Sequence, residues 1–518
     1  MPPFAQLRSW LREGPLAEKI LAAVAVAIAL GLVSLALVPV HNPAGGRVAI
    51  PAGGGSPGSS AGATGTGGAA TAGQPSSSAG TIGPSSGGTA PVSAANAAAA
   101  GSTGATSGGG SGGSAHTSTA TCQGLASSGP GVTATSVHVD IAYLDLAGPV
   151  GNAAFGIPAN IPSINNAIVD YINKSGGVAC GRKLVVTQYA VNPIDSNDEQ
   201  SKCLQMVQDN VLMVINESAY VTPVSYECFV QNHLPLQNLT SVTRQQGTSS
   251  YPYLFGPLAF SDQQARNGIL GLAARGFFKA PSYNGKLGLF EDGCDPATNQ
   301  EIGRDLTASG VGSDQESTYV LDCNLVAPPN QVAQAVLQNK VAGDGEVFLA
   351  SSIANNQTYV KIADQQNFHP RYLTSDYGSD EFPGQTWDAG FDQAVAITAT
   401  RAGELDSGIH SPAEQTCNSI LVSHGLTPIT TGSSEQTAST CDMLFLLAEA
   451  LGHAGVNPTR TSLVEDLGTM GNFHSAFLGD GVFDKPGQIT GDSFQREIEY
   501  NVSCQCWKVI DQSFGPAY

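Results

Sequence analysis

Short polar segments follow several apolar segments of the sequence, and their side chains could hold a small solute. Carboxylates, hydroxyls and amides are the groups that fix the polar parts of a buried ligand. Each of these residue types is also common in helix caps and turns, so any one of them alone is better explained as a structural residue. The candidates are Asp145 and Pro149 after residues 137–144, Glu217, Ser218 and Tyr220 after 211–215, Asp292 after 286–290, Ser351 after 346–350, and Asp376 and Tyr377 after 371–374.

The apolar segments alternate with helical ones from residue 122 onward, which predicts an α/β fold. Ligands of such folds bind beyond the carboxyl ends of the parallel strands, so the shared position of the candidates indicates a site. The part from 122 to 518 is too long for one core and suits two lobes. Two further strands are expected at 183–189 and 317–321, and helices at 161–173, 196–209, 223–232, 262–275, 297–308, 331–340, 355–366 and 441–453.

Motifs for metals, cofactors and catalysis are weak in this sequence. The nine histidines lack the spacing of a zinc site, and no C-x-x-C pair occurs. The loop at 479–492 carries three aspartates, but their spacing is not that of an EF-hand. Three G-x-S-x-G matches fall in Gly/Ser-rich sequence between 58 and 113, outside any strand-turn-helix pattern. We therefore expect no metal, no cofactor and no enzymatic activity.

The N-terminal part predicts a membrane anchor. Residues 20–40 form an apolar run, and about twenty such residues span a bilayer. Arg8, Arg12 and Lys19 precede this run, so the N-terminus is expected in the cytoplasm and the rest of the chain outside the cell. A cleaved secretory signal is the alternative, although its apolar core is normally shorter. A lipoprotein signal is excluded because the first cysteine is Cys122.

Residues 42–121 form a Gly/Ser/Ala/Thr-rich segment, which predicts a disordered linker. All ten cysteines lie beyond this segment, as expected for a domain that folds outside the cell and forms disulfides. The formal net charge of the chain is −20, which disfavours nucleic acid as a partner. The sequence thus predicts a cytoplasmic stub and anchor at 1–41, a tether at 42–121 and a folded domain at 122–518.

The order of several segments resembles that in type I periplasmic binding proteins. The resemblance is to the branched-chain amino-acid and amide binding proteins of ABC importers, over about residues 134–510. A Gly-Gly turn followed by Gly181 and Arg182 and the helical stretch at 448–455 are its most telling parts. The matching segments are AYLDLAGPVG, YINKSGGVACGRKLVVTQYAVNP, CLQMVQDNVLMVIN, FSDQQARNGILGLAARG, GKLGLFEDG and CDMLFLLAEALGHAGVNPTRTSLVEDL.

The resemblance implies a two-lobed Venus-flytrap fold, in which each lobe is a mainly parallel sheet with flanking helices. Lobe one would comprise about residues 122–259 and 400–490. Lobe two would comprise about residues 260–399 and 491–518. A small solute would bind in the cleft between the lobes.

The resemblance also implies which residues hold the solute. Ser218 with its neighbours, and then Asn238 and Thr240, match the positions in lobe one that hold the ligand. The acidic residue of lobe two that pairs with a ligand ammonium most nearly matches Asp376, with Asp292 as second choice. Replacing Asp376 with alanine is then expected to weaken binding and to leave the melting temperature of the empty protein nearly unchanged. Asp305, expected to be solvated on a helix of the same lobe, is the control for that substitution.

The lobe assignment narrows the cysteine pairing, which the sequence alone leaves open. A bridge between the lobes would prevent the hinge from moving, so pairs within one lobe are expected. Cys504 and Cys506 remain as a further pair across one residue, which is expected to be strained. The expected pairs are Cys122 with Cys180, Cys203 with Cys228, Cys294 with Cys323, and Cys417 with Cys441.

Taken together, the sequence and the resemblance predict an extracellular, membrane-tethered solute-binding protein without catalytic activity. It would capture a small polar or amino-acid-like ligand and deliver it to the permease subunits of an ABC importer. The alternative is a ligand-sensing or adhesive ectodomain of the same fold, without a role in transport.

Overall fold

The computed structural model describes residues 122–518, apart from positions 147, 149–151, 153–156, 159, 222, 240–241, 383–384 and 435. The predicted anchor at 20–40 and the predicted linker at 42–121 lie outside the described residues. Within the described part of the chain, none of the helices has the length and apolar character needed to cross a membrane.

The first sheet consists of five parallel strands in the order β2-β1-β3-β4-β5. Its two faces pack against different helices: Val139 and Ile141 of β1 lie in one apolar cluster with residues of α4, whereas Ala142 lies in another with residues of α5 and α6. The elements are β1 (Ser136–Leu144), α4 (Ile161–Lys174), β2 (Lys183–Val191), α5 (Ser196–Gln208), β3 (Val214–Glu217), α6 (Pro223–Gln231), β4 (Leu236–Asn238), α7 (Arg244–Ser249) and β5 (Leu254–Phe255).

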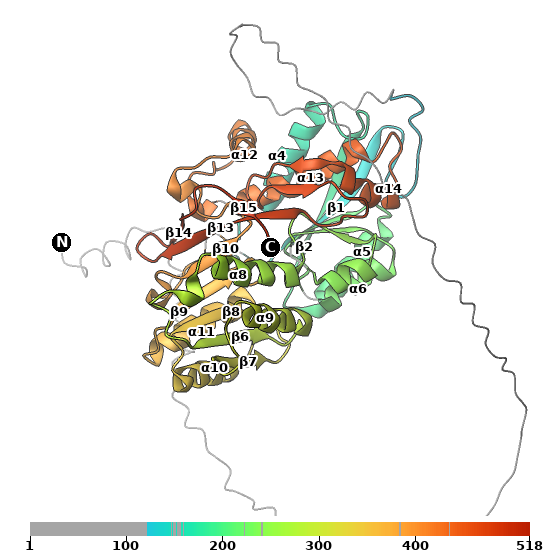
Figure 1. Ribbon diagram of the computed structural model, residues 1–518. Helices are drawn as coiled ribbons and strands as arrows, with labels where there is room; N and C mark the ends of the chain where they lie inside the picture. Colours follow the sequence, from blue (N-terminus) through green and yellow to red (C-terminus); the bar gives the residue numbers. More distant parts are fainter. Residues whose placement is uncertain are drawn as a thin grey trace, which may run out of the picture. The chain divides into compact units, whose positions relative to one another are not determined.

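The second sheet follows the order β11-β12-β13-β10-β9-β8-β6-β7, and Figure 1 labels its strands β6 to β10 and β13. Strands β6 to β10 are parallel, whereas β13 runs antiparallel to β10 and also pairs with β14 and β15. The strands are β6 (Leu287–Asp292), β7 (Glu316–Leu321), β8 (Glu346–Ala350), β9 (Arg371–Ser375), β10 (Val395–Thr398), β11 (Gly471–Phe473), β12 (Gly481–Phe483), β13 (Asp492–Asn501), β14 (Cys506–Val509) and β15 (Gly515–Pro516).

Helices cover both faces of this second sheet, as a buried parallel sheet requires. Strand β8 shows the arrangement, because all its residues are buried and its side chains alternate between two clusters. Val347 and Leu349 pack with α10 (Pro329–Ala342) and α11 (Ile353–Gln365). Phe348 and Ala350 pack with α8 (Ser261–Ala274) and α9 (Pro296–Ala308). The α/β fold with parallel sheets and flanking helices is thus confirmed.

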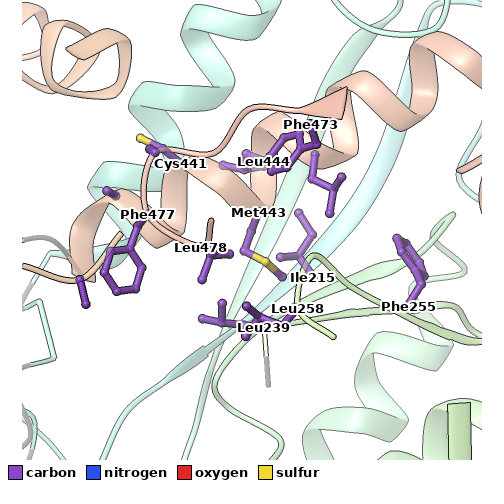
Figure 2. Close-up of a cluster of buried hydrophobic side chains, with 14 of the residues drawn as sticks. Ile215, Leu239, Phe255, Leu258, Cys441, Met443, Leu444, Phe473, Phe477 and Leu478 are labelled. Carbon is purple, nitrogen blue, oxygen red and sulfur yellow. The ribbon is translucent and has the colours of Figure 1, made fainter. Parts of the chain in front are cut away.

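The C-terminal helices return to the first sheet. Helix α13 (Gln436–His453) packs against α4 and β3, and Figure 2 shows Met443 of this helix near Ile215, Leu239 and Leu258. The chain therefore leaves the second sheet after β10 and returns to it at β11. The remaining elements are α12 (Pro412–Ser423), α14 (Arg460–Glu465) and the 3-10 turns η1 (Phe277–Lys279), η2 (Ala389–Phe391), η3 (Leu405–Ser407), η4 (Gly432–Ser434) and η5 (Asp466–Thr469).

The Gly-Gly turn before β2 has a structural explanation. Gly177 has a φ of +73°, and a Cβ there would lie 2.3 Å from the carbonyl oxygen of Arg182, so only glycine fits. The Arg182 side chain is buried, and its guanidinium donates to the carbonyl oxygens of Thr133 at 2.7 Å and Val456 at 2.6 Å and to Asn457 Oδ1 at 2.7 Å. This motif therefore joins the start of the folded domain to the loop before α14.

Five disulfides are present, and their pairs are those expected from the sequence. Two of them join neighbouring helices, α5 to α6 and α12 to α13. The Cys294 to Cys323 bond joins the segments that follow β6 and β7. These three bridges therefore join elements that follow one another closely in the sequence.

Candidate functional site

A cavity of about 300 Å³ lies where strands of the two sheets end. Leu144, Ser218 and Leu239 line it at the ends of β1, β3 and β4. Asp292 and Ser351 line it at the ends of β6 and β8. This volume is at the small end of the range of ligand cavities in proteins. A site at this edge of both sheets is what the sequence pattern predicts.

The structure places only part of the predicted site residues in the lining of this cavity. Pro149 and Thr240 lie outside the described residues. The described lining does not include Asp145, Glu217, Tyr220 or Asn238, but it does include Ser218, Asp292, Ser351, Asp376 and Tyr377. That these five residues bind a ligand stays a prediction.

The segment after β3 separates lining residues from core residues. The Asn216 side-chain oxygen accepts hydrogen bonds from the backbone N–H groups of Ala219 and Tyr220, both at 2.9 Å. This turn holds Ser218 at a φ of +59°, and Ser218 faces the cavity. Tyr220 instead points into the core, where its hydroxyl donates to the carbonyl oxygen of Glu199 at 2.9 Å. Tyr220 is thus better explained as a core residue.

Asn238, Asp145 and Glu217 have partners within the protein. The Asn238 side-chain oxygen accepts a hydrogen bond from Asn216 Nδ2. Asp145 Oδ1 accepts from the backbone N–H of Gly148 at 3.0 Å and therefore closes a turn. Glu217 is buried, and burial raises its pKa to about 8, so this side chain is neutral at pH 7.

Two carboxylates of the lining have both oxygens occupied. Asp295 caps α9: its Oδ1 accepts from the Thr298 backbone N–H at 3.0 Å, and its Oδ2 accepts from the Ser261 hydroxyl at 2.9 Å. Asp376 accepts from the Thr398 hydroxyl at one oxygen and from the Ala399 backbone N–H at 2.8 Å at the other. Neither side chain has a carboxylate oxygen without a protein donor.

The bonds of Asp376 join the end of β9 to the last residue of β10 and the residue after it, where the chain leaves the second sheet. Burial raises its pKa to about 6. From these contacts we expect, in contrast to the expectation from the sequence, that loss of this carboxylate lowers the stability of the empty protein, because two buried donors would lose their acceptor. Asp305 is also unsuitable as a solvated control, since it is only 2% exposed and pairs with Arg266 at 2.9 Å.

Asp292 differs from the other two aspartates of the lining. Its Oδ1 accepts from the backbone N–H of Cys294 at 2.7 Å, and its Oδ2 has only a long contact of 3.5 Å with the Ser351 hydroxyl. The residue is 9% exposed, and burial raises its pKa above the usual range. Its Oδ2 is thus the aspartate oxygen of the described lining with the most capacity to accept a hydrogen bond.

A buried carboxyl cluster adjoins the cavity next to Asp376. Asp380 is fully buried and accepts from Asn356 Nδ2 at 3.0 Å and from the Thr374 hydroxyl at 2.8 Å. Burial raises its pKa to about 8, and burial together with the neighbouring Asp376 raises the pKa of Glu381 well above its usual range. These two carboxyls are therefore neutral at pH 7. In the described part of the chain, no group of His, Cys, Asp and Glu side chains is arranged to hold a metal ion.

Most of the surface of the described lining is apolar, and these apolar residues were not among the residues predicted from the sequence. Ile194 follows β2 and Val326 follows β7, and they remain 62% and 52% exposed. Apolar residues just beyond a strand end were the available signal, but in a sequence they look like ordinary loop residues. The other apolar lining residues are Leu144, Leu146, Ile157, Pro193, Val221, Tyr226, Leu239, Val242, Leu258, Leu325, Ile353, Ala354 and Phe382.

No protein-family model matches the chain, and no curated protein matches it. Solved structures do. A fatty acid ABC transporter substrate-binding protein from Thermomonospora curvata matches with a TM-score of 0.54 at 15% identity, over 75% of this chain and 95% of that one. A substrate-binding protein from Desulfitobacterium hafniense in complex with Leu matches with a TM-score of 0.51 at 14% identity, over 72% of this chain and all of that one.

A third similar structure is a solute-binding protein from Rhodopseudomonas palustris BisB5 in complex with 3,4-dihydroxy benzoic acid. Its TM-score is 0.54 at 12% identity, over 74% of this chain and 98% of that one. These neighbours are solute-binding proteins of ABC transporters and not enzymes. The chain thus has the fold of the type I periplasmic binding proteins, as the resemblance implied.

Proposed function

We propose that this protein is an extracellular solute-binding protein that captures a small molecule between its two sheets and delivers it to an ABC importer. The cavity at the strand ends carries this proposal, because most of the surface of its walls is apolar and polar side chains are interspersed in them. Such a cavity holds the body of a solute by burial and orients it through hydrogen bonds. The ABC transporter proteins of the same fold support the transport role.

A purely binding role suits the chemistry of the described lining. Its hydroxyls belong to serine, threonine and tyrosine, and no histidine or lysine lines the described cavity to serve as their base. We test the role by a thermal-shift screen of the full chain over amino acids, amides, urea-like and aromatic solutes. A bound solute should raise the melting temperature in a concentration-dependent way. If cells take up that solute only when they contain this protein, the result would favour transport over the alternative role in sensing.

We further propose that residues 20–40 anchor the protein in the membrane with the folded domain outside the cell. The apolar run and the basic residues before it support this topology. Protease treatment of intact cells should release a soluble fragment that begins near Cys122. A naturally secreted form that lacks residues 1–40 would contradict the anchor and show a cleaved signal.

A further inference from the structure

We propose that the cavity takes a lipophilic primary amine without a carboxylate, bound with its ammonium group on the side chain of Asp292. The inference rests on the proposed solute-binding function and names its ligand class. It also differs from the amino-acid-like ligand that the sequence resemblance implies. Three observations support the inference. They are the apolar wall of the cavity, the negative sign of the charges in its lining, and the capacity of Asp292 Oδ2 to accept a further hydrogen bond.

The wall that the first sheet contributes is mainly hydrocarbon. Its few polar side chains include Thr243 and Gln246, and these two bind each other in a capping box at the start of α7. Burial of apolar ligand surface against such a wall is favourable. The body of the ligand should therefore be apolar. The residues of this wall include Leu144, Leu146, Ile157, Ile194, Val221 and Leu239.

The charged side chains of the described lining all have the same sign. They are Asp292, Asp295 and Asp376, and no lysine, arginine or histidine is among the described lining residues. A ligand carboxylate would add a negative charge beside these aspartates in a site of low dielectric constant, which is unfavourable. A cation has the opposite sign and is favoured. The cavity therefore selects against acids and zwitterions and for amines.

Of the three aspartates, Asp292 is the one that can take the ammonium. Asp295 and Asp376 use both oxygens within the protein, as described above. Asp292 Oδ2 has only the contact of 3.5 Å with Ser351. An ammonium there would gain a charge-assisted hydrogen bond to a buried carboxylate, and such bonds are among the stronger ones in proteins.

Exposed apolar side chains support an apolar ligand. Ile194 and Val326 lie on opposite sides of the cavity, after strands of different sheets, and more than half of each side chain is exposed to solvent. A lipophilic ligand that bridges the two walls would cover apolar surface on both. A short aromatic amine has a suitable apolar body for this small cavity.

Four probes with one phenylalkyl skeleton separate the charge classes. Phenylpropylamine carries only an amine, homophenylalanine carries the same amine plus a carboxylate, phenylbutanoate carries only the carboxylate, and phenylpropanol is neutral. We expect calorimetry on the full chain to show that the amine binds at least about tenfold more tightly than the alcohol, and more tightly still than the acid and the zwitterion.

The substitution Asp292→Asn removes the charge but keeps an oxygen that can accept from the Cys294 N–H. This variant should bind the amine and the alcohol about equally well, with the alcohol affinity little changed. Asp314→Asn makes the same change in net charge at an exposed position and should keep the amine preference.

Two results would overturn the amine assignment: no binding of phenylpropylamine to the wild-type chain, or an amine preference that persists in Asp292→Asn. Binding of homophenylalanine or phenylbutanoate that is tighter than that of phenylpropylamine would also overturn the amine assignment. It would not contradict the solute-binding function. Failure of that function would show differently, as the absence of any stabilising solute in the wider screen.

Discussion

Replacing Asp442 with alanine should lower the free energy of unfolding by at least about 3 kcal/mol. Asp442 lies in α13 and is fully buried. Its carboxylate accepts hydrogen bonds from the Ser475 hydroxyl at 2.6 Å and from the backbone N–H groups of Ala476, Phe477 at 2.7 Å and Leu478 at 2.9 Å. Alanine would leave these buried donors without their acceptor. Chemical denaturation of the two proteins measures the difference.

The exposed Asp484 is the matched control, because it directly follows β12 and lies close in sequence to the loop at 475–478. Asp484→Ala should change the free energy of unfolding by less than about 0.5 kcal/mol. If Asp442→Ala were as stable as this control, the hydrogen bonds to residues 475–478 would not hold α13 to that loop.

The protein should be more stable at mildly acidic pH than at alkaline pH. Burial raises the pKa of Glu217 and Asp380 to about 8, and that of Asp140, Glu291 and Glu346 to about 7. These groups bind protons more tightly in the folded than in the unfolded state, where carboxyl pKa values are about 4. The contribution of these groups to stability is therefore fully present below the unfolded pKa and is lost as the pH rises to about 8.

Melting curves measure this dependence. The melting temperature should be at least about 5 °C higher at about pH 5.5 than at about pH 8.5, since each unit of pKa shift corresponds to about 1.4 kcal/mol. Glu217→Gln replaces a neutral carboxyl by a neutral amide of similar shape, so this variant should lose less stability as the pH rises. A melting temperature that rises between these two pH values would contradict the neutral state of the buried carboxyls.

The fold could be predicted where the apolar pattern is long, and less well where strands are short. Strands β1, β2 and β8 lie within one or two residues of their predicted bounds at both ends. Strands β4 and β5 have only three and two residues and carry no periodic signal, so they were not predicted. The predicted strand at 211–215 is shifted, since β3 begins at Val214 and ends at Glu217.

The position of the site could be predicted from the sequence, but not the residues that line it. Polar residues at strand ends pointed to the correct edge, because parallel strands end together there. Which of them line the cavity depends on neighbours that the sequence does not show: Asn216 turns Ser218 outward and Tyr220 inward. Asp305 was expected in solvent, but its contact with Arg266 on α8 could not be read from helix periodicity.

If the cavity between the two sheets binds the solute, a substitution that fills this cavity should abolish binding. Ala354 lines the cavity at the start of α11, and Ala354→Trp places a large side chain there. Ala308→Trp adds the same side chain at an exposed position near the end of α9. Both variants are compared with the wild-type chain after their melting temperatures confirm that they are folded.

The measurement is calorimetric titration of each protein with the solute that most raises the melting temperature of the wild-type chain. We expect wild type and Ala308→Trp to bind this solute with the same affinity, and Ala354→Trp to bind it at least about a hundredfold more weakly, a loss of about 2.7 kcal/mol. Equal binding by all three proteins would contradict the account, because the solute would then bind outside the cavity.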